Sequence, residues 1–384
     1  LFSCNDAKET EGEGATGTIN AKITFTSSNA RAAQTDGLLP VTSWKNVSQV
    51  QFLVYNSTGV VVFSDIVTVP ADKTTALEKD WSNVTAGTGY TVAVVGNPTQ
   101  MKMSIDGGAS ETPWTAFNVR QKNTSALQLS HKDGTFPTWA YSGKKPLAEA
   151  GEIFLGKAAG TVDVVAGSTA NAGTISIKRA VSLMRVRVKK ATLAEGGSVA
   201  DWSNVDFNTA NSAIFLHTIP NGINAINGAL TTAPLEDGVR IQSVFGTGLL
   251  STTEPVTTGA SATHKNKVGN NTMLSNGYTM WKELIVLPND AASAGQYTFI
   301  LTAQGKAGHV LANGTTLTGD TVIYWSGLIQ ESFKATGVLE VNVLLQSGGT
   351  EWDNPGPKVE GGLEIKVEVP LDWDAAVEVT ELPL

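Results

Sequence analysis

The chain has 384 residues, of which 27 are basic and 35 acidic, so its formal net charge is −8. An acidic chain without a block of Lys and Arg argues against a nucleic-acid partner. No run approaches the ~20 apolar residues that a membrane-spanning helix needs. Only 16% of the residues are charged, whereas 39 are glycine and Thr, Ser and Val recur throughout. This composition and length favour a mostly β chain of two domains.

The chain has a single cysteine, Cys4, near its start. One cysteine excludes a disulfide framework and a cysteine-based zinc site. It follows Leu1, Phe2 and Ser3, an order typical of the end of a lipoprotein signal peptide, where the cysteine takes the lipid. A stray thiol is the alternative. The residues after it are polar and rich in glycine, so we expect residues 1–14 to be a lipidated tether.

A strictly alternating segment follows the tether. Over residues 18–26 one face carries only apolar side chains, which are Ile19, Ala21, Ile23 and Phe25. This pattern predicts a half-buried strand. Small and polar residues occupy positions 27–37, a composition typical of an exposed and easily cleaved loop. Arg31 in that loop is the only arginine among the first 119 residues.

Further short apolar segments, separated by turn residues, predict a sandwich or a barrel. They are residues 50–55, 60–67, 90–95, 153–165, 175–189, 213–217, 283–287, 297–303, 321–325 and 339–345. A second unit is expected to begin near Gly173. Residues 75–84 and 145–150 are predicted to be single-turn helical connections, and residues 249–277 a surface loop.

The C-terminal region combines a linker with a regular strand pattern. Glycine and proline between Gln346 and Gly362 indicate the linker. Beyond it, apolar residues alternate without a break, at Leu363, Ile365, Val367, Val369, Leu371 and Trp373. A strand at the end of a flexible linker can reach a sheet outside its own domain. It can equally fold back as an ordinary terminal strand, and the pattern leaves both readings open.

Residues that carry chemistry elsewhere do not form a catalytic constellation here. There is no nucleophile elbow, P-loop or dinucleotide-binding motif, so we expect no enzymatic activity and no cofactor. Asp372 and Asp374 are interpreted as a solvated strand face rather than a glycosidase pair. The histidines show no metal-ligand spacing and are expected on the surface or in loops; they are His131, His217, His264 and His309. Six tryptophans are interpreted as core or interface residues, with sugar stacking as the alternative; they are Trp44, Trp81, Trp114, Trp139, Trp281 and Trp325.

Five short features occur along the chain in an order that resembles the fimbrillin family of Bacteroidia, the major subunits of type V pili. They are Cys4 with its acidic tether, residues 15–26 ending in 27–31, residues 50–56, residues 175–180, and the linker followed by residues 363–369 and Trp373. The resemblance covers nearly the whole chain. The region before Leu339 departs from it, because it lacks the family's Arg-Asn and aromatic pattern.

The resemblance implies an all-β fold of two transthyretin-like β-sandwich domains with a C-terminal donor strand. It divides the chain into a tether (1–14), a first sandwich (15–173) with a removable first strand (15–31), a second sandwich (174–349), and a linker with the donor strand (350–384). It also implies export as an outer-membrane lipoprotein precursor to the cell surface. There an arginine-specific protease cuts between Arg31 and Ala32, and the donor strand of an identical or related subunit fills the opened groove.

The residues themselves give this exchange a physical basis. Loss of the first strand exposes apolar core and unpaired backbone groups, which invite strand addition. Burial of the six apolar donor side chains supplies on the order of 10 kcal/mol before ordering costs. Since each subunit gives and receives a strand, the contact does not close and generates a filament. The alternative is a fimbrial tip adhesin or a surface carbohydrate-binding lipoprotein, whose partners are ligands on host or bacterial surfaces.

Overall fold

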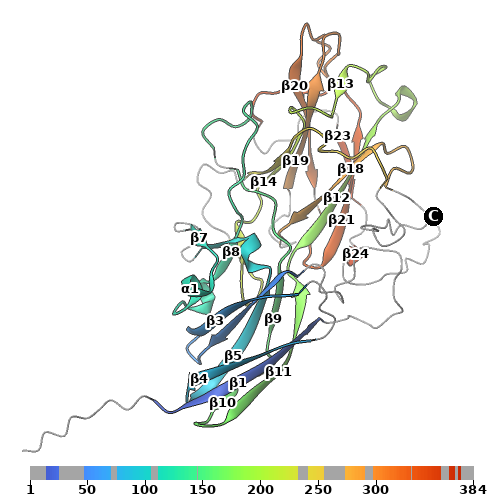
Figure 1. Ribbon diagram of the computed structural model, residues 1–384. Helices are drawn as coiled ribbons and strands as arrows, with labels where there is room; N and C mark the ends of the chain where they lie inside the picture. The colour runs from blue at the N-terminus through green and yellow to red at the C-terminus, as the bar shows by residue number, and fades with distance from the viewer. Residues whose placement is uncertain are drawn as a thin grey trace, which may run out of the picture.

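The computed structural model describes residues 14–25, 47–70, 76–104, 111–144, 146–231, 241–254, 273–289, 297–329, 331–355, 363–367 and 371–372. Within these ranges β-strands dominate, and the helical elements are short. They are η2 (Pro98–Gln100), α1 (Ala116–Val119), η3 (Thr124–Ala126) and η4 (Leu193–Glu195). The predicted all-β fold class is confirmed. Two sandwiches lie end to end in an elongated molecule, with β1 and β4 near one end and β13 and β20 near the other (Figure 1).

The first sandwich is one sheet that folds over on itself. Its strand order is β3 (Val61–Thr68), β2 (Gln49–Tyr55), β5 (Gly87–Gly96), β9 (Phe154–Lys157), β11 (Thr169–Arg179), β1 (Thr16–Phe25) and β4 (Leu77–Thr85), with β10 (Val162–Val164) also paired to β5. Although β2 and β4 are far apart in this order, the rings of Phe52 and Trp81 lie 5.1 Å apart. The two ends of the sheet therefore face each other across one core.

A small second sheet covers the other face of β2 and β5. Its strands are β16 (Leu230–Thr231), β15 (Gly222–Asn224), β8 (Gln128–Ser130), β6 (Lys102–Ser104) and β7 (Glu111–Pro113). Leu53 and Val95 pack there with Met103 and Leu129, while Phe52 and its neighbours face the first core. Since β2 and β5 are buried on both faces, they are continuous apolar runs rather than alternating ones.

The second sandwich consists of two separate sheets. One has the order β17 (Ile241–Phe245), β14 (Ala213–His217), β19 (Tyr297–Gly305), β20 (Thr321–Ile329) and β22 (Thr350–Glu351), with β13 (Val205–Asp206) beside β19. The other has the order β18 (Met280–Val286), β12 (Ser182–Lys190), β21 (Gly337–Leu345) and β23 (Leu363–Val367), with β24 (Leu371–Asp372) beside β21. Between them lies the largest apolar core, centred on residues such as Val186, Phe299, Trp325 and Val341.

The chain passes from the first sandwich to the second between β11 and β12, beyond the boundary that the sequence places at 173/174. Ile175 and Ile177, expected to open the second unit, lie in the first core because β11 pairs with β1 and β9. Leu183 packs below the small sheet, whereas Met184 belongs to the second sandwich. The two halves also exchange segments, since β15 and β16 complete the small sheet of the first half.

Two segments predicted to be helical have other structures. Residues 77–85 form strand β4, where Asn83, at a positive φ of 62°, inserts an extra residue between the paired positions Trp81 and Val84. This bulge breaks the period of two, which is why the strand was missed. In residues 145–150, Leu147 forms bridges to Asp133 and Gln242 instead of a helical turn. Of the predicted loop at 249–277, the structure describes residues 249–254 and 273–277. Ser251 in the first part forms a bridge to Trp281 of β18.

A buried charged cluster joins three strands of the second sandwich. Arg185 on β12 is 0% exposed, and it lies directly opposite Glu283 on β18 and Glu340 on β21. Its Nε lies 2.9 Å from Glu283 Oε1, and its Nη1 lies 3.1 Å from Glu340 Oε1. Arg187 donates to the carbonyl of Met273, at 3.0 Å, and its guanidinium lies 4.1 Å from the ring centre of Tyr278. Arg185 thus links β12 to both neighbouring strands by ion pairs.

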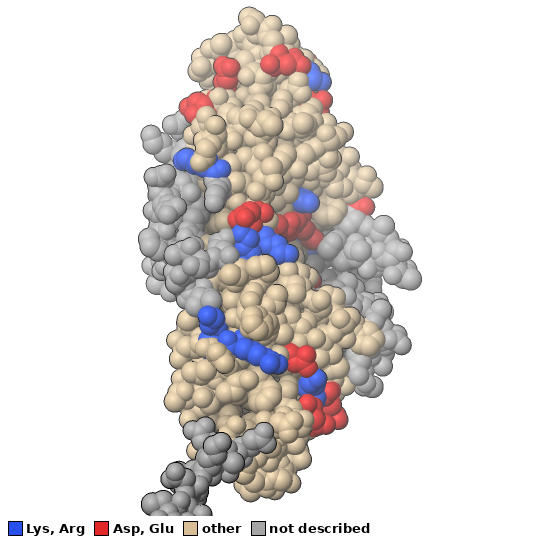
Figure 2. All heavy atoms as spheres, turned by 60° about the vertical axis from the view of Figure 1, so that its left-hand side comes forward, with Lys and Arg blue, Asp and Glu red and all other residues tan. Residues whose placement is uncertain are grey.

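Charged side chains are sparse on the face shown in Figure 2, and positive and negative groups lie next to each other. This distribution differs from the continuous basic surface of a nucleic-acid-binding protein. Among the described residues, no helix has the length and apolar character to cross a membrane.

Candidate functional site

Strand β1 occupies an internal position in the first sheet. It pairs in parallel with β11, where Ile23 lies opposite Ile175, and antiparallel with β4, where Ile19 lies opposite Trp81. The side chains of Ile19, Ala21 and Ile23 are 0% exposed and belong to the first core. The backbone of Phe25 pairs with Ile177, at the end of the strand. The alternation correctly predicts this strand and the core positions of Ile19, Ala21 and Ile23, whereas removal of the strand stays a prediction.

The slot that holds β1 is narrow at Gly17. A Cβ atom placed there would lie 2.4 Å from the carbonyl oxygen of Val165 and 2.9 Å from that of Ser168. Both obstacles are backbone, so position 17 admits only glycine unless the loop before β11 moves. We refer to the space between β4 and β11, from position 17 to position 25, as the β1 slot.

The exposed face of β1 makes polar contacts with β4. Asn20 Nδ2 donates to Asp80 Oδ1 at 2.7 Å, and Lys22 Nζ lies 3.4 Å from Glu78 Oε1. Removal of β1 would break these contacts and leave two facing rows of unpaired backbone groups on β4 and β11. It would also uncover Trp81 of the first core. An opened β1 slot would therefore present an unpaired strand edge on each side.

The terminal strand β23 lies at home, at the edge of the second sandwich. It pairs antiparallel with β21, with Leu363 opposite Leu345, Ile365 opposite Val343 and Val367 opposite Val341. Leu371 in β24 pairs with Val338. Of the two readings that the sequence left open, the structure has the strand folded back on its own domain. Because β23 has only β21 as a described strand neighbour, its release breaks one ladder of backbone hydrogen bonds.

Several of the predicted site residues lie outside the described residues. They are the lipidation residue Cys4, the processing residues Arg31 and Ala32, and the donor residues Val369 and Trp373. Their roles stay predictions.

The residues just before the C-terminal strand pack in an aromatic cluster that the sequence did not predict. We call it the aromatic clasp, and its members are Phe136, Trp139, Tyr141, Phe215 and Trp352. Trp352 lies 5.0 Å from Trp139 and 5.1 Å from Tyr141 between ring centres, with its ring edge-on to both. Phe136, Trp139 and Tyr141 come from the connection between β8 and β9. This segment of the first half therefore covers the outer face of β14 and β20.

Hydrogen bonds fasten the clasp to residues 352–355, which lie within the predicted linker. The hydroxyl of Tyr141 donates to the carbonyl of Pro355 at 2.8 Å, and its oxygen lies 2.9 Å from His217 Nε2, which donates to it. The backbone N–H of Tyr141 and the indole N–H of Trp352 both donate to Asn354 Oδ1, at 2.8 and 3.1 Å. Residues 352–355, which the sequence assigns to the linker, are thus fixed to the sandwich.

We expect acid to weaken the protein through His217. Burial, aided by the charge of Lys144, lowers the pKa of His217 from 6.5 to about 4. The unfolded chain therefore binds a proton on this group at a higher pH than the folded chain does. Stability should fall as the pH drops from 6.5 toward 4, by on the order of 3 kcal/mol from this group. Denaturant unfolding at pH 7, 5 and 4 measures the loss.

The His217→Gln variant isolates this contribution, because glutamine carries no titrating group. Its stability should change less between pH 7 and pH 4 than that of the parent chain. Identical pH profiles for the two proteins would show that His217 is not the titrating group. The comparison is needed because burial raises the pKa of Glu149, which acts in the opposite direction.

His131 and His309 lie in loops, as expected, but both are buried, and His217 lies on strand β14. His131 Nδ1 donates to the carbonyl of Ala148 at 2.9 Å, and His309 Nε2 donates to that of Gly348 at 2.8 Å. These bonds each satisfy one ring nitrogen of a buried histidine, and the spacing of the histidines in the sequence does not reveal either partner. In the part of the chain that the structure describes, no group of three or more His, Cys, Asp and Glu side chains lies close enough to hold a metal.

The tryptophans divide between core and surface. Trp81, Trp114 and Trp325 are buried in the apolar cores, which agrees with their interpretation as core residues. Trp281 donates its indole N–H to the carbonyl of Thr253. Trp139 in the aromatic clasp is only partly buried.

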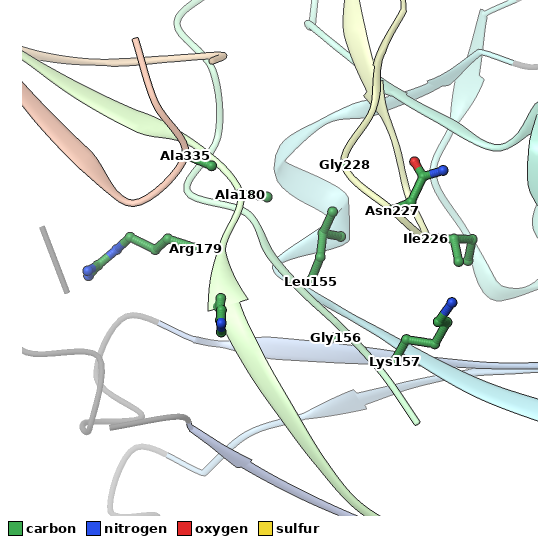
Figure 3. Close-up of a pocket in the computed structure, with 10 residues that line it drawn as sticks. Leu155, Gly156, Lys157, Arg179, Ala180, Ile226, Asn227, Gly228 and Ala335 are labelled. Atoms are coloured by element: carbon green, nitrogen blue, oxygen red, sulfur yellow. The ribbon is translucent and has the colours of Figure 1, made fainter. Parts of the chain in front are cut away.

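A pocket of about 270 Å³ lies where the two sandwiches and the small sheet meet (Figure 3). Its wall includes Leu155 and Lys157 of β9, Asn227 from the turn between β15 and β16, and Ala335 before β21. Arg179 points away from Lys157 and Asn227 in this view, and its Nε lies 2.6 Å from Glu152 Oε1. The pocket marks the joint between the two halves.

The model of one protein family, described as fimbrillin-A associated anchor proteins Mfa1 and Mfa2, matches residues 37–247. This match covers more than half of the chain. The chain belongs to this family. The matched range begins after β1 and ends before β18, so β1 and β23 both lie outside it. The fimbrillin resemblance found in the sequence is confirmed at the level of the family.

Solved structures also resemble this member of the anchor family. A proposed cell adhesion protein from Bacteroides eggerthii is 13% identical, with a TM-score of 0.48, and covers 94% of this chain and 97% of its own. A proposed cell adhesion protein from Parabacteroides distasonis is 10% identical, with a TM-score of 0.49 and coverage of 94% and 99%. A fimbrilin from Porphyromonas gingivalis is 14% identical, with a TM-score of 0.42 and coverage of 91% and 96%. No curated protein matches the chain.

Proposed function

We propose that this chain is a structural subunit of a cell-surface fimbria that polymerises by donor-strand exchange after cleavage at Arg31. Before cleavage the precursor is held at the outer membrane by a lipid on Cys4. An arginine-specific protease then separates β1 from the rest of the first sandwich. The C-terminal strand of another subunit enters the β1 slot, and repetition of this step builds a filament.

The observation that carries the proposal is the internal position of β1. A strand between two neighbours, with Ile19 and Ile23 fully buried, cannot leave without creating a long acceptor surface. Each isoleucine contributes roughly 1.5 to 3 kcal/mol when it is buried. The opened domain therefore has a large drive to bind a strand with the same alternation.

The position of the terminal strand supports its role as the donor. At home it lies at a sheet edge and pairs with β21 alone among the described strands, whereas in the β1 slot it would have neighbours on both sides. The exchange replaces one backbone ladder by two. Leu363, Ile365 and Val367 are also larger on the whole than Ile19, Ala21 and Ile23, which increases the apolar surface available for burial.

The distribution of arginine supports selective processing. Arg179, Arg185 and Arg187 are buried and paired within the fold. Arg31 lies in a run of small and polar residues directly after β1. Arg120 is exposed and Arg240 lies outside the described residues, so these two are the remaining alternative sites for an arginine-specific protease.

A cleavage experiment tests the proposal. The purified precursor is treated with a low concentration of an arginine-specific protease, and the products are followed by N-terminal sequencing and by gel electrophoresis without boiling. We expect one early cut after Arg31, followed by a ladder of oligomers. The Arg31→Ala variant is the matched control, and it should stay uncut and monomeric. Diffuse digestion without oligomers, or a ladder formed equally by Arg31→Ala, contradicts the proposal.

The family description favours a second candidate, a subunit that anchors the fimbria to the cell. An anchor would keep its lipid and would not require release of β1. The same digestion separates the two functions. An anchor accepts subunits while the bond after Arg31 stays intact, whereas a polymerising subunit assembles only once that bond is cut.

A further inference from the structure

We infer the register of the exchange: residues 361–369 of a second copy of this chain take the positions of residues 17–25, in the same direction, with Gly361 at the Gly17 position. This inference rests on the proposed function and adds to it the residues that select the incoming strand. Residues 361, 362, 368 and 369 lie outside the described residues, so only their residue types enter the argument.

The narrow point of the β1 slot is the first constraint. At position 17 a Cβ would lie 2.4 Å from the Val165 carbonyl oxygen and 2.8 Å from Val164 Cγ1. Whatever strand fills the slot must therefore have glycine at this position. Positions 19, 21 and 23, which face the core, must receive apolar side chains.

Only one placement of the terminal segment meets both requirements. Two positions further along in the same direction, Leu363 would occupy position 17. Two positions back, Val359 would occupy it. In the reverse direction, residues from 363–369 can also fill positions 19, 21 and 23 with apolar side chains. Those placements put Val369 or Leu371 at position 17, where only glycine fits. With Gly361 at position 17, Leu363, Ile365 and Val367 reach positions 19, 21 and 23.

The polar face gives an independent observation in favour of this register. It places Lys366 at the position of Lys22, which faces Glu78 with 3.4 Å between Nζ and Oε1. The incoming strand thus restores the same ion pair. Both partners of this pair are well exposed, so it adds little affinity and serves mainly to select the register.

The same register has one unfavourable contact. Glu364 would replace Asn20, whose amide donates to Asp80 at 2.7 Å, and would set two carboxylates side by side. Exposure and salt screen this repulsion. Replacement of Glu364 by asparagine should therefore speed assembly, most clearly at low ionic strength.

Two neighbouring glycines provide a matched pair of variants. Gly361→Thr places a side chain at the blocked position 17. Gly362→Thr places one at position 18, where Thr18 is the natural occupant. After cleavage of the full chain, we expect Gly361→Thr to lower the polymerised fraction about tenfold or more, because overpacking against backbone has no low-cost relief. Gly362→Thr should polymerise like the parent.

Engineered disulfides then read the register directly. In the full chain with Cys4→Ala, the pair Glu78→Cys and Lys366→Cys should form intermolecular disulfides in filaments, since directly opposed strand residues lie within disulfide range. The control pair, Glu78→Cys and Glu364→Cys, is displaced by two residues and lies beyond ~7 Å. It should not cross-link. Uncleaved protein should not cross-link with either pair.

Each result bears on the inference in a defined way. Filaments that cross-link only through residue 366, and that Gly361→Thr prevents, support it. Filaments that form normally but cross-link through residue 364, or that tolerate Gly361→Thr, overturn the register and leave donor-strand exchange intact. If cleaved protein forms no filaments at all, both the register and the proposed function are wrong.

Discussion

A chain that ends at Gly362 should fold and be cleaved after Arg31, yet form no filaments. The deletion removes β23 and β24, which pair only with β21 among the described strands. Val341, Val343 and Leu345 keep their places because β21 also pairs with β12 and packs in the second core. The truncated protein therefore retains an acceptor but has no strand to donate. Electron microscopy and sedimentation after proteolysis measure the outcome.

A shorter truncation is the matched control for this experiment. A chain that ends at Trp373 keeps all six alternating apolar residues and should assemble. Added in small amounts to the intact subunit, the chain that ends at Gly362 should cap filaments and shorten them. Regular filaments grown from that chain alone would show that the donor lies elsewhere. Amorphous aggregates, recognised by microscopy, would instead reflect the uncovered edge of β21.

The second large effect concerns the buried charged cluster. Replacement of Arg185 by methionine should destabilise the chain by roughly 3 to 5 kcal/mol, because Glu283 and Glu340 would both lose this buried cation and Glu340 would keep only Arg187, whose Nη1 lies 3.9 Å from Glu340 Oε2. The predicted loss exceeds the worth of any exposed ion pair in the molecule. The shift of the midpoint of denaturant unfolding, followed by tryptophan fluorescence, measures it.

Two controls separate the effect of burying an ion pair from the effect of changing the net charge. Lys22→Met also removes one cation, but from an exposed pair with Glu78, and should cost about 0 to 1 kcal/mol. A double variant that changes Arg185 to methionine and Glu283 to leucine should recover most of the lost stability, since the remaining Glu340 keeps Arg187, whose Nη1 lies 3.9 Å from Glu340 Oε2. A single Arg185→Met variant as stable as Lys22→Met would contradict this account.

Strands with one exposed face were accessible to sequence analysis. Strict alternation places β1 within two residues of its observed bounds, and the predicted segment 213–217 coincides with β14. The period failed where a second constraint acted. In β4 the bulge at Asn83 shifts the phase, and the three-residue strands of the small sheet are too short to show any period. The all-β class could thus be predicted, but the small sheet could not.

Contacts between distant parts of the chain were out of reach for a related reason. Tyr141 and Pro355 are 214 positions apart, and neither carries a local signal that points to the other. The boundary between the sandwiches was misplaced because β11 and β12 follow each other almost without a break and both alternate. The sequence could not predict whether β23 pairs within its own domain, because an alternating strand can pair with any sheet edge that has one apolar face.

The aromatic clasp has a consequence for the geometry of a fibre. If the clasp holds Pro355 in the assembled state as it does here, the segment that connects one subunit to the next starts at Pro355 and ends at Gly361. Six residues span at most about 20 Å when fully extended. Successive subunits must then sit nearly in contact, so the fibre should be closely packed and resist stretching, since its joints have little slack.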